Sequence, residues 1–203
     1  MGPSAPPALV GTPDAGASWT DLSGDLRLYK SVGLPGFANH VLALRGSGGR
    51  AWGDGADPFF YSVGGTTGDA EAVTGLTLLA GSARPFPVRG YPWGVRSGST
   101  AWSTSAEYRI PLARVNRAPG NLPVYLDWVS GSLFVDAGNA WGGETAGSGF
   151  SNPRGAPLVS VGGELIMNGL PLWTSSTLLR TGLAVPLREG DGPTVYVRLG
   201  LPF

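Results

Sequence analysis

The stretch Pro87-Val88-Arg89-Gly90-Tyr91 lies in a long segment rich in glycine and proline, and two acidic residues follow it in more regular segments. Glu107 belongs to Ser105-Ala106-Glu107-Tyr108-Arg109-Ile110-Pro111-Leu112, and Asp136 belongs to Phe134-Val135-Asp136-Ala137-Gly138-Asn139. We interpret the first stretch as part of a loop that folds back into a β-barrel. There we expect Arg89 to meet Glu107 and Asp136, because a guanidinium inside a barrel needs carboxylate partners.

Apolar and polar residues alternate in many parts of the chain, which indicates β-strands. The alternation predicts seven strands, at residues 19–30, 40–47, 102–110, a strand that ends at 138, and residues 158–167, 173–187 and 194–203. Irregular parity before Ser130 indicates a bulge, and Asn168-Gly169 predicts a turn. Glu107 and Asp136 both fall on the polar rows of their strands, as the expected pairing with Arg89 requires.

Composition limits the classes of function. The 203 residues suit one domain, and 14 basic residues balance 14 acidic ones, so no net charge points to nucleic acid. The chain has no cysteine and one histidine, which excludes thiolate metal sites and any site with several histidines. The single histidine also argues against a Ser-His-Asp triad.

Two segments lack regular alternation. Residues 1–16 are rich in proline, glycine and alanine, and we interpret them as a disordered lead-in or the remnant of an upstream segment. Residues 48–99 are interpreted as one long loop, which is typical of a functional or a disordered segment. Seven aromatic residues from Trp52 to Trp93 favour the functional interpretation. Residues 17–203 as a whole are predicted to form a partial barrel.

No apolar run approaches the ~20 residues of a membrane-spanning helix, so a soluble β-protein and a membrane β-barrel both remain open. Most predicted strands have the length of tilted transmembrane strands, and their non-apolar rows carry small and polar residues that suit a wet lumen. A soluble sandwich shares the alternation. The alternatives are thus a soluble all-β binding module, with the long loop as its binding surface, or a passive outer-membrane channel.

Four pieces occur in an order that carries a family resemblance. They are Gly64-Gly65 ahead of Val88-Arg89-Gly90-Tyr91, the segment from Glu107 to Leu112, the segment from Phe134 to Trp141, and the terminal Leu199-Gly200-Leu201-Pro202-Phe203. With these pieces, residues 20–203 resemble the C-terminal barrel half of the BamA/TamA/FhaC superfamily, also called the bacterial surface antigen family. The resemblance implies an all-β fold, an antiparallel transmembrane barrel of sixteen strands, of which this chain holds about seven.

The resemblance also implies the roles of particular residues. Residues 48–99 correspond to the large sixth extracellular loop, which tucks into the lumen. The loop anchor would consist of Arg89, Gly90, Tyr91, Glu107 and Asp136. The C-terminal signal read by the barrel assembly machinery would consist of Val197, Leu199, Gly200, Leu201 and Phe203.

By the same resemblance the protein would lie in the bacterial outer membrane and insert or translocate proteins, or export another substrate. Its partners would be outer-membrane lipid, the barrel assembly machinery and an unfolded outer-membrane or secreted protein, with no nucleic acid. That the protein binds no cofactor and catalyses no reaction is also implied by the resemblance. Seven strands are fewer than the eight of the smallest bacterial barrels. We therefore expect that the chain lacks its first half or completes a barrel with other copies.

Four charged residues have other interpretations from the sequence alone. Glu107 and Asp136 could be the paired carboxylates of a glycosidase, but the sequence lacks a sugar-binding aromatic pattern. Glu164 and Arg180 are expected to line the lumen without a specific role.

Overall fold

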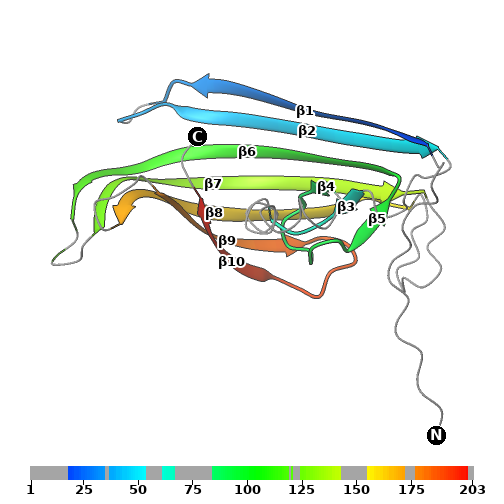
Figure 1. Ribbon diagram of the computed structural model, residues 1–203. Helices are drawn as coiled ribbons and strands as arrows, with labels where there is room; N and C mark the ends of the chain where they lie inside the picture. The colour runs from blue at the N-terminus through cyan, green and yellow to red at the C-terminus, as the bar shows by residue number, and fades with distance from the viewer. Residues whose placement is uncertain are drawn as a thin grey trace, which may run out of the picture.

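The computed structural model describes residues 18–34, 37–53, 61–66, 84–118, 120, 124–142, 155–171 and 177–200. These residues form an all-β structure in which the main sheet is antiparallel (Figure 1). The predicted lead-in at residues 1–16 lies outside the described residues. No helix long and apolar enough to cross a membrane occurs in the described part of the chain.

The main sheet has seven strands, in the order β1-β2-β6-β7-β8-β9-β10. Their bounds are β1 (Trp19–Val32), β2 (His40–Gly53), β6 (Thr100–Arg117), β7 (Val124–Trp141), β8 (Leu158–Pro171), β9 (Thr177–Pro186) and β10 (Thr194–Gly200). The prediction of seven antiparallel strands is thus confirmed. Every strand pairs with its neighbour in this order, and β1 and β10 are the two edges among the described residues.

The segment predicted as one loop over residues 48–99 differs from that prediction in two ways. β2 continues to Gly53, because residues 48–50 pair with β6 and residues 48–53 pair with β1. Beyond it lies a second sheet of three short strands, β3 (Tyr61–Val63), β4 (Arg84–Phe86) and β5 (Arg96–Gly98), with β3 in the centre. In the sequence these strands cannot be told from loop segments, because alternation over three residues carries almost no signal.

The predicted bulge is confirmed, and the predicted turn is wrong. The register between β7 and β8 shifts between Leu126 and Trp128. Asn168 and Gly169 lie inside β8, where they pair with these same two residues of β7. The Asn-Gly pair therefore sits opposite the bulge and does not close a hairpin.

The small sheet packs on one face of the main sheet (Figure 1). The apolar core lies between the two sheets. Tyr61, Val63 and Val88 come from the loop segment and are fully buried. They meet a floor of small residues from β2, β6 and β7, namely Ala51, Ala101 and Ala140. The small side chains on this face leave room for the loop. We call this face, which is turned toward the small sheet, the inner face.

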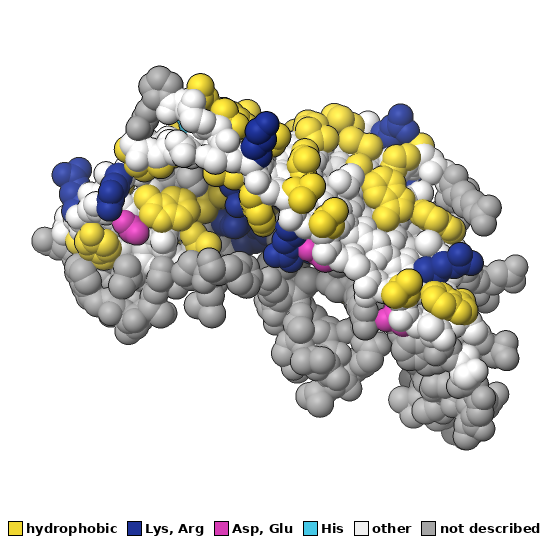
Figure 2. Space-filling view, turned by 90° about the horizontal axis from the view of Figure 1, so that it is seen from above, with side chains coloured by type: hydrophobic (Ala, Val, Ile, Leu, Met, Phe, Trp, Pro, Cys, Tyr) yellow, Lys and Arg dark blue, Asp and Glu magenta, His cyan; other side chains and the backbone are white. Residues whose placement is uncertain are grey.

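The opposite, outer face of the main sheet carries exposed aliphatic side chains. The exposed fraction reaches 69% for Leu22 in β1, 60% for Leu133 in β7 and 72% for Val195 in β10. Hydrophobic side chains also spread over much of the described surface in Figure 2. The alternation read from the sequence therefore places apolar rows outward and polar rows inward, the reverse of a soluble sandwich whose apolar rows face each other.

Two strand glycines test this packing. A methyl group at Gly162 of β8 would collide with the Phe134 ring and the Leu183 carbonyl oxygen, whereas nothing lies within 4 Å of the same position at Gly46 of β2. Gly162→Ala should lower the free energy of unfolding by about 1–3 kcal/mol, the usual cost of overpacking. Gly46→Ala is the matched control and should not destabilise the protein. Urea unfolding followed by tryptophan fluorescence measures both; equal stability of the two variants would contradict the described packing.

Candidate functional site

The loop carries Arg89 to the middle of the inner face by means of two glycine-dependent contacts. Gly65 forms a β-bridge with Val88, and its N–H donates to the Tyr91 carbonyl at 3.0 Å. Gly90 has a φ of +89°, and a Cβ there would lie 3.0 Å from the Cβ of Ala184 in β9. The loop can make this tight turn against the wall because glycine has no side chain to strain or to collide.

Asp136 of β7 is the principal partner of Arg89. The guanidinium donates from Nε to Asp136 Oδ2 and from Nη2 to Oδ1, both at 2.7 Å, and the Arg89 backbone N–H donates to Oδ2 at 3.2 Å. This is a two-pronged pair in which the planar guanidinium matches the carboxylate edge. Both residues are buried.

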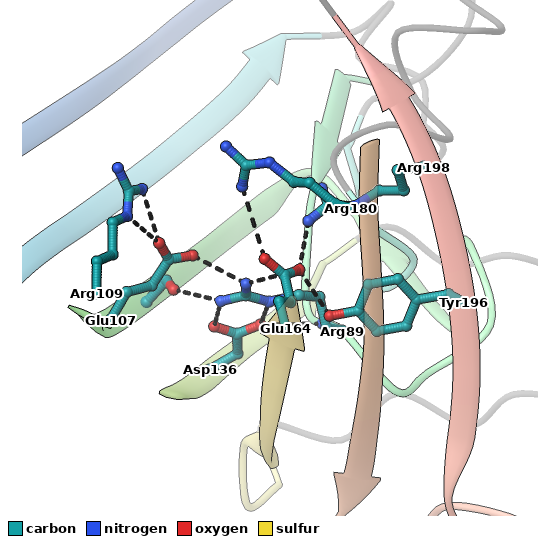
Figure 3. A network of polar contacts seen from close by, with 9 residues as sticks. Arg89, Glu107, Arg109, Asp136, Glu164, Arg180, Tyr196 and Arg198 are labelled. Carbon is teal, nitrogen blue, oxygen red and sulfur yellow. Dashed lines mark hydrogen bonds and ion pairs between the residues drawn. The ribbon is translucent and has the colours of Figure 1, made fainter. Parts of the chain in front are cut away.

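The remaining donors of Arg89 reach two further strands (Figure 3). Nη1 lies 2.8 Å from Glu107 Oε1 in β6 and 3.2 Å from Glu164 Oε1 in β8, and Nη2 donates to Ser105 Oγ at 2.9 Å. With the two bonds to Asp136, four of the five guanidinium N–H groups have a hydrogen-bond acceptor, and Nη1 also forms the ion pair with Glu164. The Phe134 ring covers its face, with Cζ of Arg89 3.5 Å from the ring centroid.

The charge balance keeps Arg89 cationic inside the protein. Burial alone would lower the pKa of its guanidinium, because a low-dielectric surrounding disfavours the charged form. The hydrogen bonds and the charge of Asp136, followed by the charges of Glu107 and Glu164, outweigh burial and raise the pKa above its usual value. The site is therefore a buried ion cluster whose parts come from the loop and from three strands.

The structure brings together every residue of the predicted loop anchor. Arg89, Glu107 and Asp136 are in contact as the sequence predicts. The Tyr91 hydroxyl lies 2.8 Å from the Val159 carbonyl and 2.5 Å from the Arg188 carbonyl, and it accepts from the Val159 N–H at 3.2 Å. Tyr91 thereby fixes the loop to the start of β8 and to the turn between β9 and β10.

The predicted C-terminal signal is described only in part. Val197 is on the outer face with 65% of its surface exposed. The backbones of Leu199 and Gly200 pair with Leu179 and Leu178 of β9. Leu201 and Phe203 lie outside the described residues. Recognition of this segment by another protein stays a prediction.

Sequence reasoning missed Glu164 as a member of the cluster. Its carboxylate contacts Arg89. It also accepts hydrogen bonds from the Tyr196 hydroxyl at 2.7 Å and from Arg198 Nη2 at 2.5 Å. Arg180 Nη1 lies 3.6 Å from its other oxygen. The parity of β8 placed Glu164 on the inner row, which is the signal that could have found it. What the alternation could not give was the register that sets Glu164 beside Ser132 of β7.

A second buried arginine of the loop was also missed. Arg96 in β5 donates to Asn139 Oδ1 at 2.5 Å, to the Ala156 carbonyl at 3.0 Å and to Glu189 Oε2 at 2.6 Å. These partners lie in β7, in the segment before β8 and in the turn after β9. Arg96 thus ties the far side of the loop to the end of the sheet where these segments meet.

The oxygens of Glu107 and Asp136 are engaged by arginine donors. Arg109 holds the Glu107 oxygen that Arg89 leaves free, at 2.7 Å, and both oxygens of Asp136 accept from Arg89. Among the described residues, no three His, Asp or Glu side chains are grouped to hold a metal ion. Comparison of the chain with protein-family models, with curated proteins and with solved structures found no match.

Replacing Arg89 tests whether the ion cluster around it stabilises the protein. Arg89→Ala leaves the buried Asp136 carboxylate without its charged partner and takes one cation from Glu107 and Glu164, and it should cost about 3–5 kcal/mol of unfolding free energy. Arg89→Lys should not restore stability, because an ammonium cannot form the two-pronged bond to Asp136. The control is Arg27→Ala, which removes a half-exposed side chain in a surface pair and should cost under about 1 kcal/mol. Equal costs for the two alanine variants, measured by urea unfolding in detergent, would contradict the buried cluster.

Proposed function

We propose that this chain is part of an outer-membrane β-barrel of the BamA-like superfamily, which inserts proteins into the outer membrane, translocates them or exports another substrate. The observation that carries the proposal is the inversion of the sheet's two faces. Charged residues are buried on the inner face, while leucine and valine are exposed on the outer face. Water does not favour that arrangement, whereas lipid outside and a wet lumen inside do.

The strand lengths support the lipid-facing interpretation. β6 and β7 have 18 residues each, and β1, β2 and β8 have 14. A tilted strand needs roughly 9–11 residues to cross the hydrocarbon core. These strands therefore have enough length to cross it and to extend beyond it.

The two edges of the sheet require partners in this setting. A bilayer offers no water to the free N–H and C=O groups of β1 and β10, and each unsatisfied group costs several kcal/mol. We propose that further strands pair with both edges and close a barrel. The loop cluster then lies in its lumen, where it holds a plug that narrows the passage.

The substrate and the partners follow from the family resemblance. The order of Gly64-Gly65, the Arg89 loop, the Glu107 strand, the Asp136 strand and the terminal segment supports the BamA-like assignment. The proposed substrate is an unfolded outer-membrane or secreted protein, and the proposed partner in biogenesis is the barrel assembly machinery. The proposed function involves no cofactor and no covalent step, because the carboxylates of the cluster are paired with Arg89.

An arginine on the outer face tests the membrane assignment. Leu133→Arg places a charge at a position with 60% exposure near the middle of β7. In a bilayer it should cost about 2–4 kcal/mol and lower the yield of protein folded into liposomes. Leu133→Ile is the matched control and should fold normally. The folded yield is measured by heat-modifiable gel mobility. A soluble binding module would give the opposite result, with Leu133→Arg folding as well as the control in detergent-free buffer.

A further inference from the structure

Glu164 reaches across an intervening strand to the edge of the sheet. It belongs to β8, yet two of its partners, Tyr196 and Arg198, belong to β10. Gly182 of β9 makes this possible, since a Cβ there would lie 2.6 Å from the Tyr196 hydroxyl oxygen and 2.9 Å from Glu164 Cγ. Because Gly182 has no side chain, the Glu164 carboxylate and the Tyr196 hydroxyl meet over the inner face of β9, and Figure 3 shows these two side chains in contact.

Glu164 also separates two like charges. Arg180 and Arg198 are direct cross-strand partners in the hairpin of β9 and β10, and both point to the inner face. Arginines placed opposite each other repel and destabilise a hairpin. The Glu164 side chain, with no exposed surface, contacts both guanidinium groups and offsets that repulsion.

The same carboxylate oxygen serves the loop. Oε1 of Glu164 accepts from Tyr196 and Arg198 and lies 3.2 Å from Nη1 of Arg89. A second, longer contact joins the same two parts, from Thr194 Oγ1 to the Gly90 carbonyl at 3.4 Å. The loop anchor and the edge strand therefore share one buried negative charge.

We propose that Glu164 is a positioning residue that couples the docking of the loop to the seating of β10 on β9. When β10 leaves β9, Glu164 loses its contacts with Tyr196 and Arg198. The position of the carboxylate that contacts Arg89 is then no longer fixed by β10. By linkage, release of the loop weakens the hold on β10 to the same extent. The coupling goes beyond the proposed function, because it concerns contacts within the chain and holds whichever substrate the barrel handles.

Trypsin reports the docking of the loop, because cleavage after the buried Arg89 and Arg96 requires the loop to leave the inner face. The full chain folded in detergent is digested, and the peptides are identified by mass. Tyr196→Phe removes one bond to Glu164 without touching the loop and should raise cleavage at both sites several-fold. Glu164→Gln should raise it roughly tenfold or more, as expected for lost bonds to a charged group. Val195→Ala, an outer-face change in the same strand, is the control and should leave cleavage unchanged.

A disulfide between β9 and β10 completes the test. Leu183 and Val195 are direct cross-strand partners on the outer face. The chain has no cysteine of its own, so cysteines introduced at these two positions can pair only with each other within the chain. In the Tyr196→Phe background, oxidised Leu183→Cys/Val195→Cys should restore protection of the loop, and reduction should remove it. If Tyr196→Phe leaves the loop as protected as in the wild type, or the oxidised staple fails to restore protection, the coupling is refuted. Because the readout is protease protection, this result is independent of any transport assay.

Discussion

A buried guanidinium without partners is among the costliest groups a protein can hold, and the described structure is arranged to supply partners to Arg89. Glu107, Asp136 and Glu164 come from three adjacent strands and converge on it. Without Arg89, Asp136 would lose the cation that binds both of its oxygens, whereas Glu107 would keep Arg109 and Glu164 would keep Arg180 and Arg198. The loop and the wall therefore stabilise each other: the loop brings the charge that the wall needs, and the wall gives the loop a fixed place.

The second constraint is the contrast between the two faces of the sheet. Strand alternation alone produces two rows, and the choice of side chains gives each row its environment. Alanine, serine and glycine line the inner face below the small sheet, so the loop approaches closely and the charges can meet. Leucine and valine line the outer face, where no described part of the chain covers them. In the proposed barrel, lipid supplies that cover, and the ion cluster faces the lumen.

The sequence allowed prediction of the strands, because alternation is visible locally, whereas the pairing of Arg89 with Glu107 and Asp136 was implied by the family resemblance and supported by strand parity. Alternation gives the parity of each strand, and parity places Glu107 and Asp136 on the inner row. The role of Glu164 depended on register across three strands, which no local pattern encodes. The turn predicted at Asn168-Gly169 was wrong because β8 continues through this pair to Pro171 and both residues pair with β7. The small sheet was missed because its strands have three residues each.

Hydrogen exchange of the loop amides between Phe86 and Gly98 tests the central claim most directly, since exchange there requires the loop to leave the inner face. Asp136→Asn keeps the shape of the side chain and removes the charge that holds Arg89. The account predicts that this change accelerates exchange throughout the loop by roughly tenfold or more, as for other lost bonds to a charged group, while the paired amides of β7 and β8 remain protected. Loop exchange equal to that of the wild type would contradict the claim that the buried ion cluster holds the loop in place.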